Sequence, residues 1–108
     1  MPEYRLNIVF RHSLGRDVIE DHMERLLDAF FETHPEVGAV VGANFHLKTM
    51  DATFSLPARD AKTASSLGVG VFGDALAASG LEPTEIVEIN VQVVNAVEEP
   101  LEGELLPV

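Results

Sequence analysis

The order strand, helix, strand occurs twice along this chain, and this repeat limits the possible folds more than any other feature of the sequence. In the first half, residues 4–10 alternate between large apolar side chains and polar or smaller ones, which is typical of a half-buried β-strand. The residues predicted to face the core are Tyr4, Leu6, Ile8 and Phe10. The segment Ser13–Arg16 is a predicted turn.

A helix is predicted from Asp17 to about His34. Asp17 and Glu20 have the spacing of a capping box, and Pro35 ends the helix. Acidic residues line one side of this helix, so the opposite, apolar side should face a core. That apolar stripe consists of Ile19, Met23, Leu26, Leu27, Phe30 and Phe31.

The second half begins with a predicted strand from Gly38 to Leu47, whose core side would carry Ala39, Val41, Ala43, Phe45 and Leu47. Lys48–Asp51 is a predicted polar turn, and a third strand alternates inward Ala52, Phe54 and Leu56 with polar residues. A second helix is predicted from Pro57 or Asp60 to Ser79, with Gly80 ending it. Its predicted inner stripe consists of Ala61, Ala64, Leu67, Gly68, Val71, Phe72 and Ala75. The last strand would turn inward Val87, Ile89, Val91 and Val93.

These elements predict one α+β domain over residues 1–95, followed by an acidic tail over residues 96–108. The order βαββαβ favours a ferredoxin-like sandwich, in which a four-stranded sheet carries both helices on one face. Two amphipathic helices cover only one side of such a sheet. The other face is therefore open to water, a ligand or another subunit.

The alternation also predicts which residues lie on that open face. They are rich in amides, hydroxyls and mixed charges, and they lack the pair of exposed aromatic rings on which a sheet-type RNA-binding domain stacks bases. Three interpretations stay open: a solvated face, a hydrogen-bonded homodimer interface, or a small-molecule pocket completed by a second subunit. The candidate ligand or interface residues are Arg5, Asn7, Asn44, His46, Asn90 and Gln92.

Composition excludes several function classes. With 18 acidic and 7 basic residues the formal net charge is -11, so the chain lacks the basic cluster that nucleic acid or an anionic membrane would require. No cysteine is present, which rules out disulfides and thiolate metal sites. No apolar run is long enough to span a membrane and no signal peptide is recognisable, so we expect a cytoplasmic protein.

Two apparent motifs carry no cofactor or metal prediction. The glycines Gly68, Gly70 and Gly73 match a dinucleotide-binding pattern, but that pattern needs a strand directly before it, and here the glycines fall inside a predicted helix. They are instead expected to let the helix pack closely. The four histidines, at positions 12, 22, 34 and 46, have no metal-ligand spacing, so neither a metal nor a cofactor is predicted.

Pro2 follows the initiator methionine, whose removal would leave a secondary amine at the start of the first strand. In this respect, and in its two strand–helix–strand halves, the chain resembles the tautomerase superfamily, whose members use an N-terminal catalytic proline. The resemblance implies an enzyme in which Pro2 acts as the base and Arg11 or Arg5 holds a substrate carboxylate. The polar alternation of the first strand departs from the family's pattern.

The sequence thus favours a non-catalytic, acidic binding or interaction domain. We expect it to self-associate, with a dimer favoured, through its open face or an edge strand. A basic protein partner or a small ligand is the other expected occupant of the open face. The tautomerase-like enzyme remains the alternative.

Overall fold

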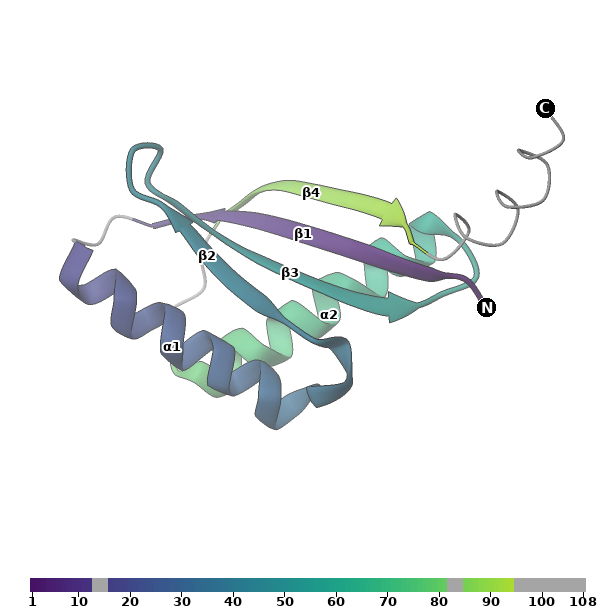
Figure 1. Cartoon of the computed structure of the whole chain (residues 1–108), viewed down its shortest axis with the longest axis horizontal. Coiled ribbons are helices and arrows are strands. Elements are labelled where there is room, and N and C mark those ends of the chain that lie inside the picture. Colours follow the sequence, from purple (N-terminus) through teal and green to yellow (C-terminus); the bar gives the residue numbers. More distant parts are fainter. Residues whose placement is uncertain (13–15, 82–84, 95–108) are drawn as a thin grey trace, which may run out of the picture.

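The computed structural model describes residues 1–12, 16–81 and 85–94, and the side chains of residues 16 and 17 lie outside that description. In Figure 1 the strands of the sheet lie above the long helices. Along the chain the elements are β1 (Glu3–Arg11), α1 (Arg16–Thr33), a 3-10 turn η1 (Pro35–Val37), β2 (Val40–Asn44), β3 (Thr49–Pro57), α2 (Ala61–Ser79) and β4 (Ile86–Val93). The predicted order βαββαβ is confirmed.

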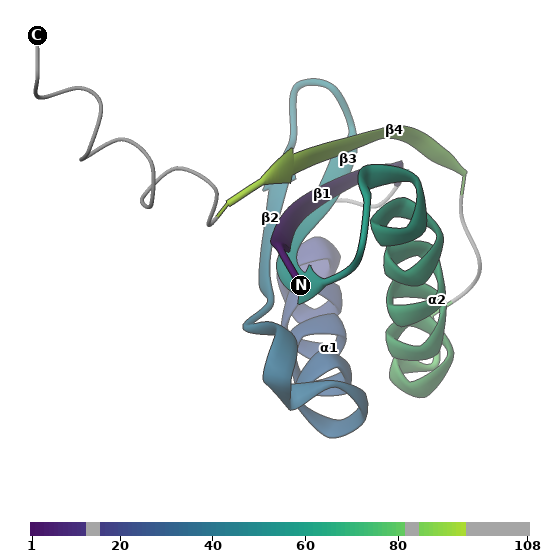
Figure 2. The same ribbon diagram turned by 90° about the vertical axis from the view of Figure 1, so that its right-hand side faces the viewer.

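The four strands form one sheet in the order β2-β3-β1-β4, and each strand is antiparallel to its neighbours. Each helix connects two strands that run in the same direction with a third strand between them. Both helices lie on the same face of the sheet, which is plain in the end-on view of Figure 2. This is the ferredoxin-like sandwich that the sequence predicted, and no helix of the described residues covers the second face of the sheet.

The core lies between the sheet and the helices, where the alternation placed it. Leu6 and Ile8 of β1 and Phe54 of β3 are at most 1% exposed. Two tilted aromatic pairs join the layers: Phe10 meets Phe72 of α2 with ring centroids 5.0 Å apart, and Phe54 meets Phe30 of α1 at 5.4 Å. Aromatic contacts of this kind add stability beyond the apolar area that they bury.

The glycine motif lies wholly within α2, so it is not a phosphate-binding turn. Gly68 faces β1 so closely that a Cβ atom there would lie 2.3 Å from Leu6 Cδ2, which confirms that this glycine serves close packing on the sheet. A Cβ atom at Gly70 or Gly73 would meet nothing within 4 Å. Only Gly68 of the three is therefore required by packing among the described residues.

Both predicted ends of α2 are confirmed. Asp60 is the N-cap, and its side chain accepts a hydrogen bond of 2.7 Å from the backbone N–H of Thr63. The same bond holds the pKa of Asp60 below its usual value. Gly80 follows the last helical residue in the left-handed conformation, at φ 77°, which residues other than glycine rarely adopt. Arg25 of α1 donates to the Ser79 carbonyl at 2.9 Å and so ties the two helices together.

The hairpin between β2 and β3 differs from its prediction. The turn occupies residues 45–48, with Lys48 in the left-handed region at φ 58°, and β3 already begins at Thr49. The predicted turn Lys48–Asp51 is therefore wrong, and Met50 is a buried core residue. Leu47 was expected to face the core but is 62% exposed. The strand alternation stops at Asn44 because that residue ends β2.

Further core assignments are corrected, among them Val93 at the end of β4, which is 38% exposed although the alternation had placed it in the core. Phe31 of α1 is 57% exposed and Leu67 of α2 is 49% exposed, because each lies at the margin of its helix's apolar stripe. In β4 the register with β1 shifts between Val9 and Phe10, so that Ile86 lies opposite Phe10. This β-bulge leaves Val87 39% exposed, although simple alternation had placed it in the core.

Some predictions lie outside the described residues, namely the turn at Ser13 to Gly15, the side-chain cap of Asp17 and the acidic tail over residues 96–108. Within the described part of the chain, neither long helix is apolar enough over 18 residues to span a bilayer.

Candidate functional site

The open face of the sheet is organised in rows that run across the strands, because antiparallel register places residues directly opposite one another. The row through Asn7, in the middle of β1, crosses all four strands. The rows on either side of it contain the charges. In order along β1 the rows are Ser55–Arg5–Gln92, Val40–Thr53–Asn7–Asn90, Gly42–Asp51–Val9–Glu88 and Asn44–Thr49–Arg11. Glu3 begins β1 on the same side.

A hydrogen-bonded centre lies in the middle of this face. The side-chain amide of Asn7 donates to Asp51 Oδ2 at 3.0 Å and to Thr53 Oγ1 at 2.8 Å. From the other side, Asn90 Nδ2 donates to Asn7 Oδ1 at the long distance of 3.5 Å. Asn7 is half-buried among these neighbours. The side chains of β3, β1 and β4 are therefore linked across the face and hold one another in place.

Gly42 of β2 makes room for the carboxylate in this centre. A Cβ atom at Gly42 would lie 2.9 Å from Asp51 Oδ1, too close for any side chain without a shift of Asp51. The absence of a side chain on the β2 side and the bond from Asn7 on the β1 side together fix the position of the Asp51 carboxylate. This is a preorganised acceptor on an otherwise open surface.

Arg5 stands apart from the other arginines. Arg11 pairs with Glu85 at 3.1 Å, Arg25 lies 3.8 Å from Asp21, and Arg59 lies 3.9 Å from Asp60. Among the arginines whose side chains are described, Arg5 alone has no carboxylate partner. It projects from the centre of the sheet between Ser55 and Gln92, where its guanidinium is available to an external acidic group.

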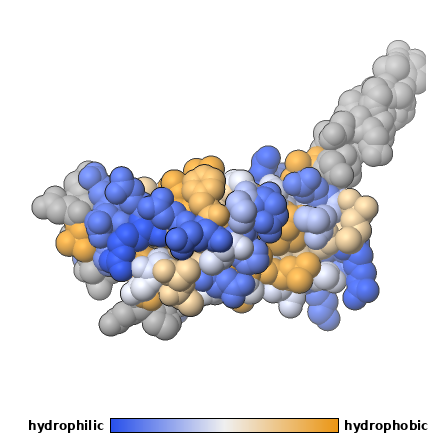
Figure 3. Space-filling view, turned by 90° about the horizontal axis from the view of Figure 1, so that it is seen from below, coloured by the Kyte–Doolittle hydropathy of each residue, from blue (hydrophilic) through white to orange (hydrophobic). Residues whose placement is uncertain are grey.

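The open face carries far less net charge than the rest of the protein. Its strands present two arginines, Arg5 and Arg11, against the three carboxylates Glu3, Asp51 and Glu88, and Glu85 directly before β4 adds a fourth carboxylate beside Arg11, whereas the chain as a whole has a net charge of -11. The helix side is the acidic side, and α1 alone exposes Glu20, Asp21, Glu24, Asp28 and Glu32. Figure 3 shows strongly hydrophilic side chains gathered on this side.

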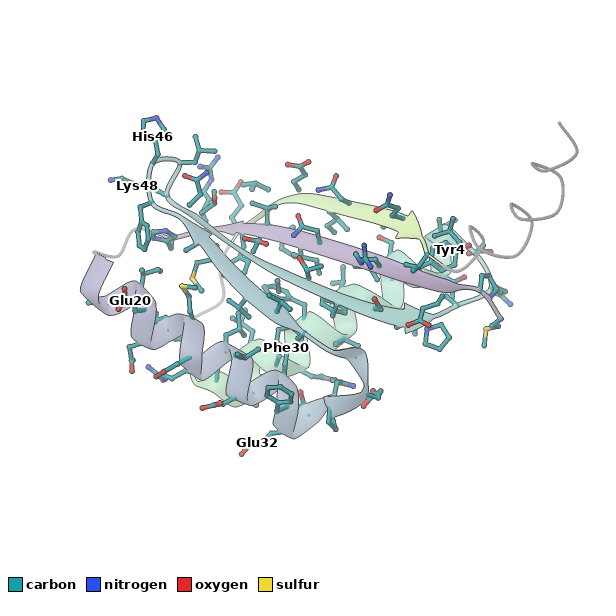
Figure 4. The ribbon with its side chains drawn as sticks, in the orientation of Figure 1. Tyr4, Glu20, Phe30, Glu32, His46 and Lys48 are labelled. Atoms are coloured by element: carbon teal, nitrogen blue, oxygen red, sulfur yellow. The ribbon has the colours of Figure 1, made fainter. Side chains whose placement is uncertain are left out.

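Of the six predicted site residues, the structure brings four together. Asn7 and Asn90 share a hydrogen bond, and Arg5 and Gln92 are register partners in the next row. Asn44 lies at the end of β2, where its side chain accepts from the backbone N–H of Leu47 at 3.0 Å and so shapes the hairpin. His46 is in the turn rather than on the face, and Figure 4 shows it at the hairpin tip near Lys48.

The sequence prediction missed the most ordered acidic group of the face. Asp51 was assigned to a turn, and Thr49 and Val40 were not assigned to the open face. The signal was present, because the inward alternation of Ala52, Phe54 and Leu56 continues backward to Met50. Extending the strand by that step would have placed Asp51 and Thr49 on the open side.

The residues named for the enzymatic alternative are not brought together within the chain. Pro2 precedes β1 and Arg11 ends it, and nine extended residues separate them by about 30 Å. Pro2 is half-buried beside the segment between β3 and α2, where its backbone carbonyl accepts a hydrogen bond from the Ala58 N–H at 3.1 Å. Arg5 is the arginine nearer to Pro2 along the strand.

A second polar cluster lies on the helix side. His34 follows α1 and places Nε2 at 2.9 Å from Asp74 Oδ2 of α2 and Nδ1 at 3.4 Å from Glu36 Oε2. The hydrogen bond to Asp74 raises the pKa of His34, partial burial opposes that effect, and Glu36 adds to it. This cluster joins the end of α1 to α2. Neither this cluster nor any other group of three or more histidine or acidic side chains among the described residues is arranged so that it could hold a metal ion.

Comparisons with known proteins identify the fold only. No protein-family model matches the chain, and no curated protein matches it. Among solved structures, it is similar to a protein from Chloroflexus aurantiacus J-10-fl described as a candidate antibiotic biosynthesis monooxygenase, with a TM-score of 0.51 and 19% identity over 85% of this chain and 92% of that one. A REP-associated tyrosine transposase bound to a REP hairpin has a TM-score of 0.49 and 14% identity, over 86% of this chain and 56% of that one.

Proposed function

We propose that the protein is a non-catalytic binding domain that self-associates through its open sheet face to form a homodimer. The observation that supports this most is the combination of an ordered polar centre and a low net charge on the sheet face that no helix covers in the described part of the chain. A chain with a net charge of -11 repels its own copies. The electrostatic repulsion between two copies is smallest where the carboxylates of the contacting surface are balanced by arginines.

The polar character of the face is compatible with such an interface. Interfaces between proteins that also exist apart are about as polar as ordinary surface and contain roughly one hydrogen bond per 100–200 Å². The bonds among Asn7, Asp51 and Thr53 are already formed within one subunit, so association does not have to order these side chains. Preorganisation of this kind lowers the entropic cost of binding.

We also propose that the protein acts in the cytoplasm, since a chain without cysteine gains nothing from an oxidising compartment. A basic protein or a small acidic molecule remains the alternative occupant of the open face. Arg5 would receive the acidic group of a small ligand, whereas a basic protein would be drawn to Asp51 and Glu88.

The test is sedimentation velocity of the full-length protein and two variants with the same substitution on opposite faces. Val40, on the open face, is 65% exposed, and Val69, on α2, is 40% exposed. The wild type should sediment as a dimer, Val40→Glu should shift it toward the monomer, and Val69→Glu should leave the dimer intact. Thermal melting checks that both variants fold.

The opposite outcomes are equally informative. A wild type that remains monomeric over the whole concentration range would overturn the proposal. A dimer that Val69→Glu disrupts and Val40→Glu does not would place the interface on the helix side instead.

A further inference from the structure

The charges on the open face alternate along β1 in a pattern that is antisymmetric about Asn7. Going from one end of β1 to the other, Glu3 is negative and Arg5 is positive. Asn7 is neutral, and the row of Val9 is negative through the flanking residues Asp51 and Glu88. Arg11 at the end is positive. Arg5 therefore has an acidic row at the same distance on the other side of Asn7, and Glu3 has Arg11, whose guanidinium is also paired with Glu85 of its own subunit at 3.1 Å.

This pattern is self-complementary when two copies of the sheet face each other across a two-fold axis. The axis lies midway between the two sheets, runs perpendicular to the strands and passes over Asn7. A two-fold interface brings the same patch of both subunits together. Residue numbers that sum to 14 then face each other along the two β1 strands. Asn7 meets its own copy, Glu3 faces the partner subunit's Arg11, and Arg5 lies over the partner subunit's Val9.

We propose that, in the homodimer, Arg5 of each subunit is seated between the partner subunit's Asp51 and the partner subunit's Glu88. This inference rests on the proposed function and adds the pairing that fixes the register and direction of the two sheets. Arg5 is suited to this role because it has no carboxylate partner among the described residues of its own subunit. Glu88 likewise has no ion pair there.

Other arrangements of the same two faces bring like charges together. Moving the axis by one residue toward the start of β1 places Glu3 over the partner's acidic row. Moving it by one residue the other way places Arg5 over the partner subunit's Arg11. An axis parallel to the strands keeps each row over its own copy, so Arg5 meets the partner subunit's Arg5. Like charges held close across an interface strongly disfavour it.

The dimensions fit this pairing. Facing sheets pack about 10 Å apart and keep their strands within about 30° of each other. The long side chain of Arg5 bridges that gap, and its row neighbours Ser55 and Gln92 carry no charge that would compete for it. Asp51 is held in position by Asn7 at 3.0 Å, so one of the two acceptors is preorganised.

The test uses two single charge reversals, Arg5→Glu and Glu88→Arg, because both residues are exposed and neither forms an ion pair among the described residues. The dimer dissociation constant of each variant alone should be at least tenfold higher than that of the wild type, since each homodimer would contain two like-charge pairs. Glu88→Arg makes the chain less negative than -11, so a weaker dimer in this variant does not arise from greater overall repulsion.

An equimolar mixture of the two variants should restore dimerisation to within about threefold of the wild type. In the heterodimer, Glu at position 5 meets Arg at position 88, and the native Arg5 of one chain meets the native Glu88 of the other. Native mass spectrometry distinguishes this heterodimer from the two homodimers by mass. Circular dichroism and thermal melting confirm that each variant is folded.

The outcomes separate this pairing from the proposed function. A monomeric wild type would overturn both. A dimeric wild type whose two variants remain dimers, or whose mixture forms no heterodimer, would overturn the Arg5 pairing and leave the proposed face to be judged by the Val40→Glu experiment.

Discussion

The side-chain amide of Asn7 on β1 donates a hydrogen bond of 3.0 Å to the carboxylate of Asp51 on β3, and this bond organises the centre of the open face. The same amide nitrogen donates to Thr53 at 2.8 Å. The side chain of Asn7 on β1 therefore holds two acceptor side chains of β3, Asp51 and Thr53, in place. A surface that would otherwise be a set of independent polar groups becomes a preformed patch, and preorganisation of this kind lowers the entropic cost of binding.

Replacing Asn7 tests the contribution of this centre. Asn7→Ala should lower the free energy of unfolding by about 1 kcal/mol, because two hydrogen bonds to a half-buried side chain are lost. It should also weaken the dimer, since Asp51 loses its donor. Urea denaturation and sedimentation measure the two effects. The matched control is Asn90→Ala, an exposed amide with a single long bond, which should change stability by less than about 0.5 kcal/mol.

The glycines of α2 provide a second comparison. Gly68→Ala should destabilise the protein, because the new Cβ atom would overlap Leu6. The overlap should lower the free energy of unfolding by about 1–3 kcal/mol, which the higher helix propensity of alanine offsets only in part. Gly73→Ala meets open space and should stabilise the helix by about 1 kcal/mol. Melting temperatures of the two variants, measured side by side, should move in opposite directions. Equal shifts would mean that α2 does not pack on β1 through Gly68.

The strands and helices were predictable because their patterns extend over many residues. The alternation of β1 and the apolar stripe of α1 each place buried side chains such as Ile8 and Phe30 correctly, and Asp60 and Gly80 mark helix ends through their own chemistry. The hairpin was not, because its turn contains apolar Phe45 and Leu47, which look like the continuation of a strand.

The candidate site was predictable only in part, for a different reason. Alternation along one strand assigns Arg5 and Asn7 to the open face, but it does not say which residues of other strands lie beside them. The neighbours on other strands depend on the register of the strand pairs. In this sheet the register brings Asp51 next to Asn7 and puts the bulge at Val87 next to Phe10. The charge pattern about Asn7 therefore becomes visible only when the strands are aligned.

The contact between His34 and Asp74 predicts a pH dependence of stability. Asp74 raises the pKa of His34, so the contribution of this pair is fully present below pH 6.5, the ordinary pKa of histidine, and is lost as the pH rises through the higher folded-state pKa. Because Asp74 is 65% exposed, the contribution should not exceed about 1 kcal/mol. Asp74→Asn should therefore lower the melting temperature at pH 5.5 and have little effect at pH 9.

The control for that experiment is Asp28→Asn, an exposed carboxylate on α1 without an ion pair among the described residues. Its effect on the melting temperature should be similar at both pH values. A difference between wild type and Asp74→Asn that is larger at pH 9 than at pH 5.5 would contradict the assigned direction of the His34 pKa shift.

Pro2 separates the binding domain from the enzymatic alternative. Its carbonyl accepts from Ala58, and alanine keeps that carbonyl, so Pro2→Ala should preserve the fold and the dimer. The wild type should not accelerate the enol–keto conversion of a small keto acid, as followed by ultraviolet absorbance. Acceleration that disappears in Pro2→Ala, or when residues are added before Pro2, would establish the tautomerase-like reaction instead.

The most direct test of association through the open face uses the absence of cysteine from the chain. A single thiol is introduced by Val40→Cys on the open face or by Val69→Cys on α2, and each protein is treated with a short bifunctional thiol reagent. We predict efficient cross-linking into a species of twice the 11.7 kDa chain mass for Val40→Cys and very little for Val69→Cys. Cross-linking of Val69→Cys alone, or of neither protein at concentrations where sedimentation shows a dimer, would contradict the account.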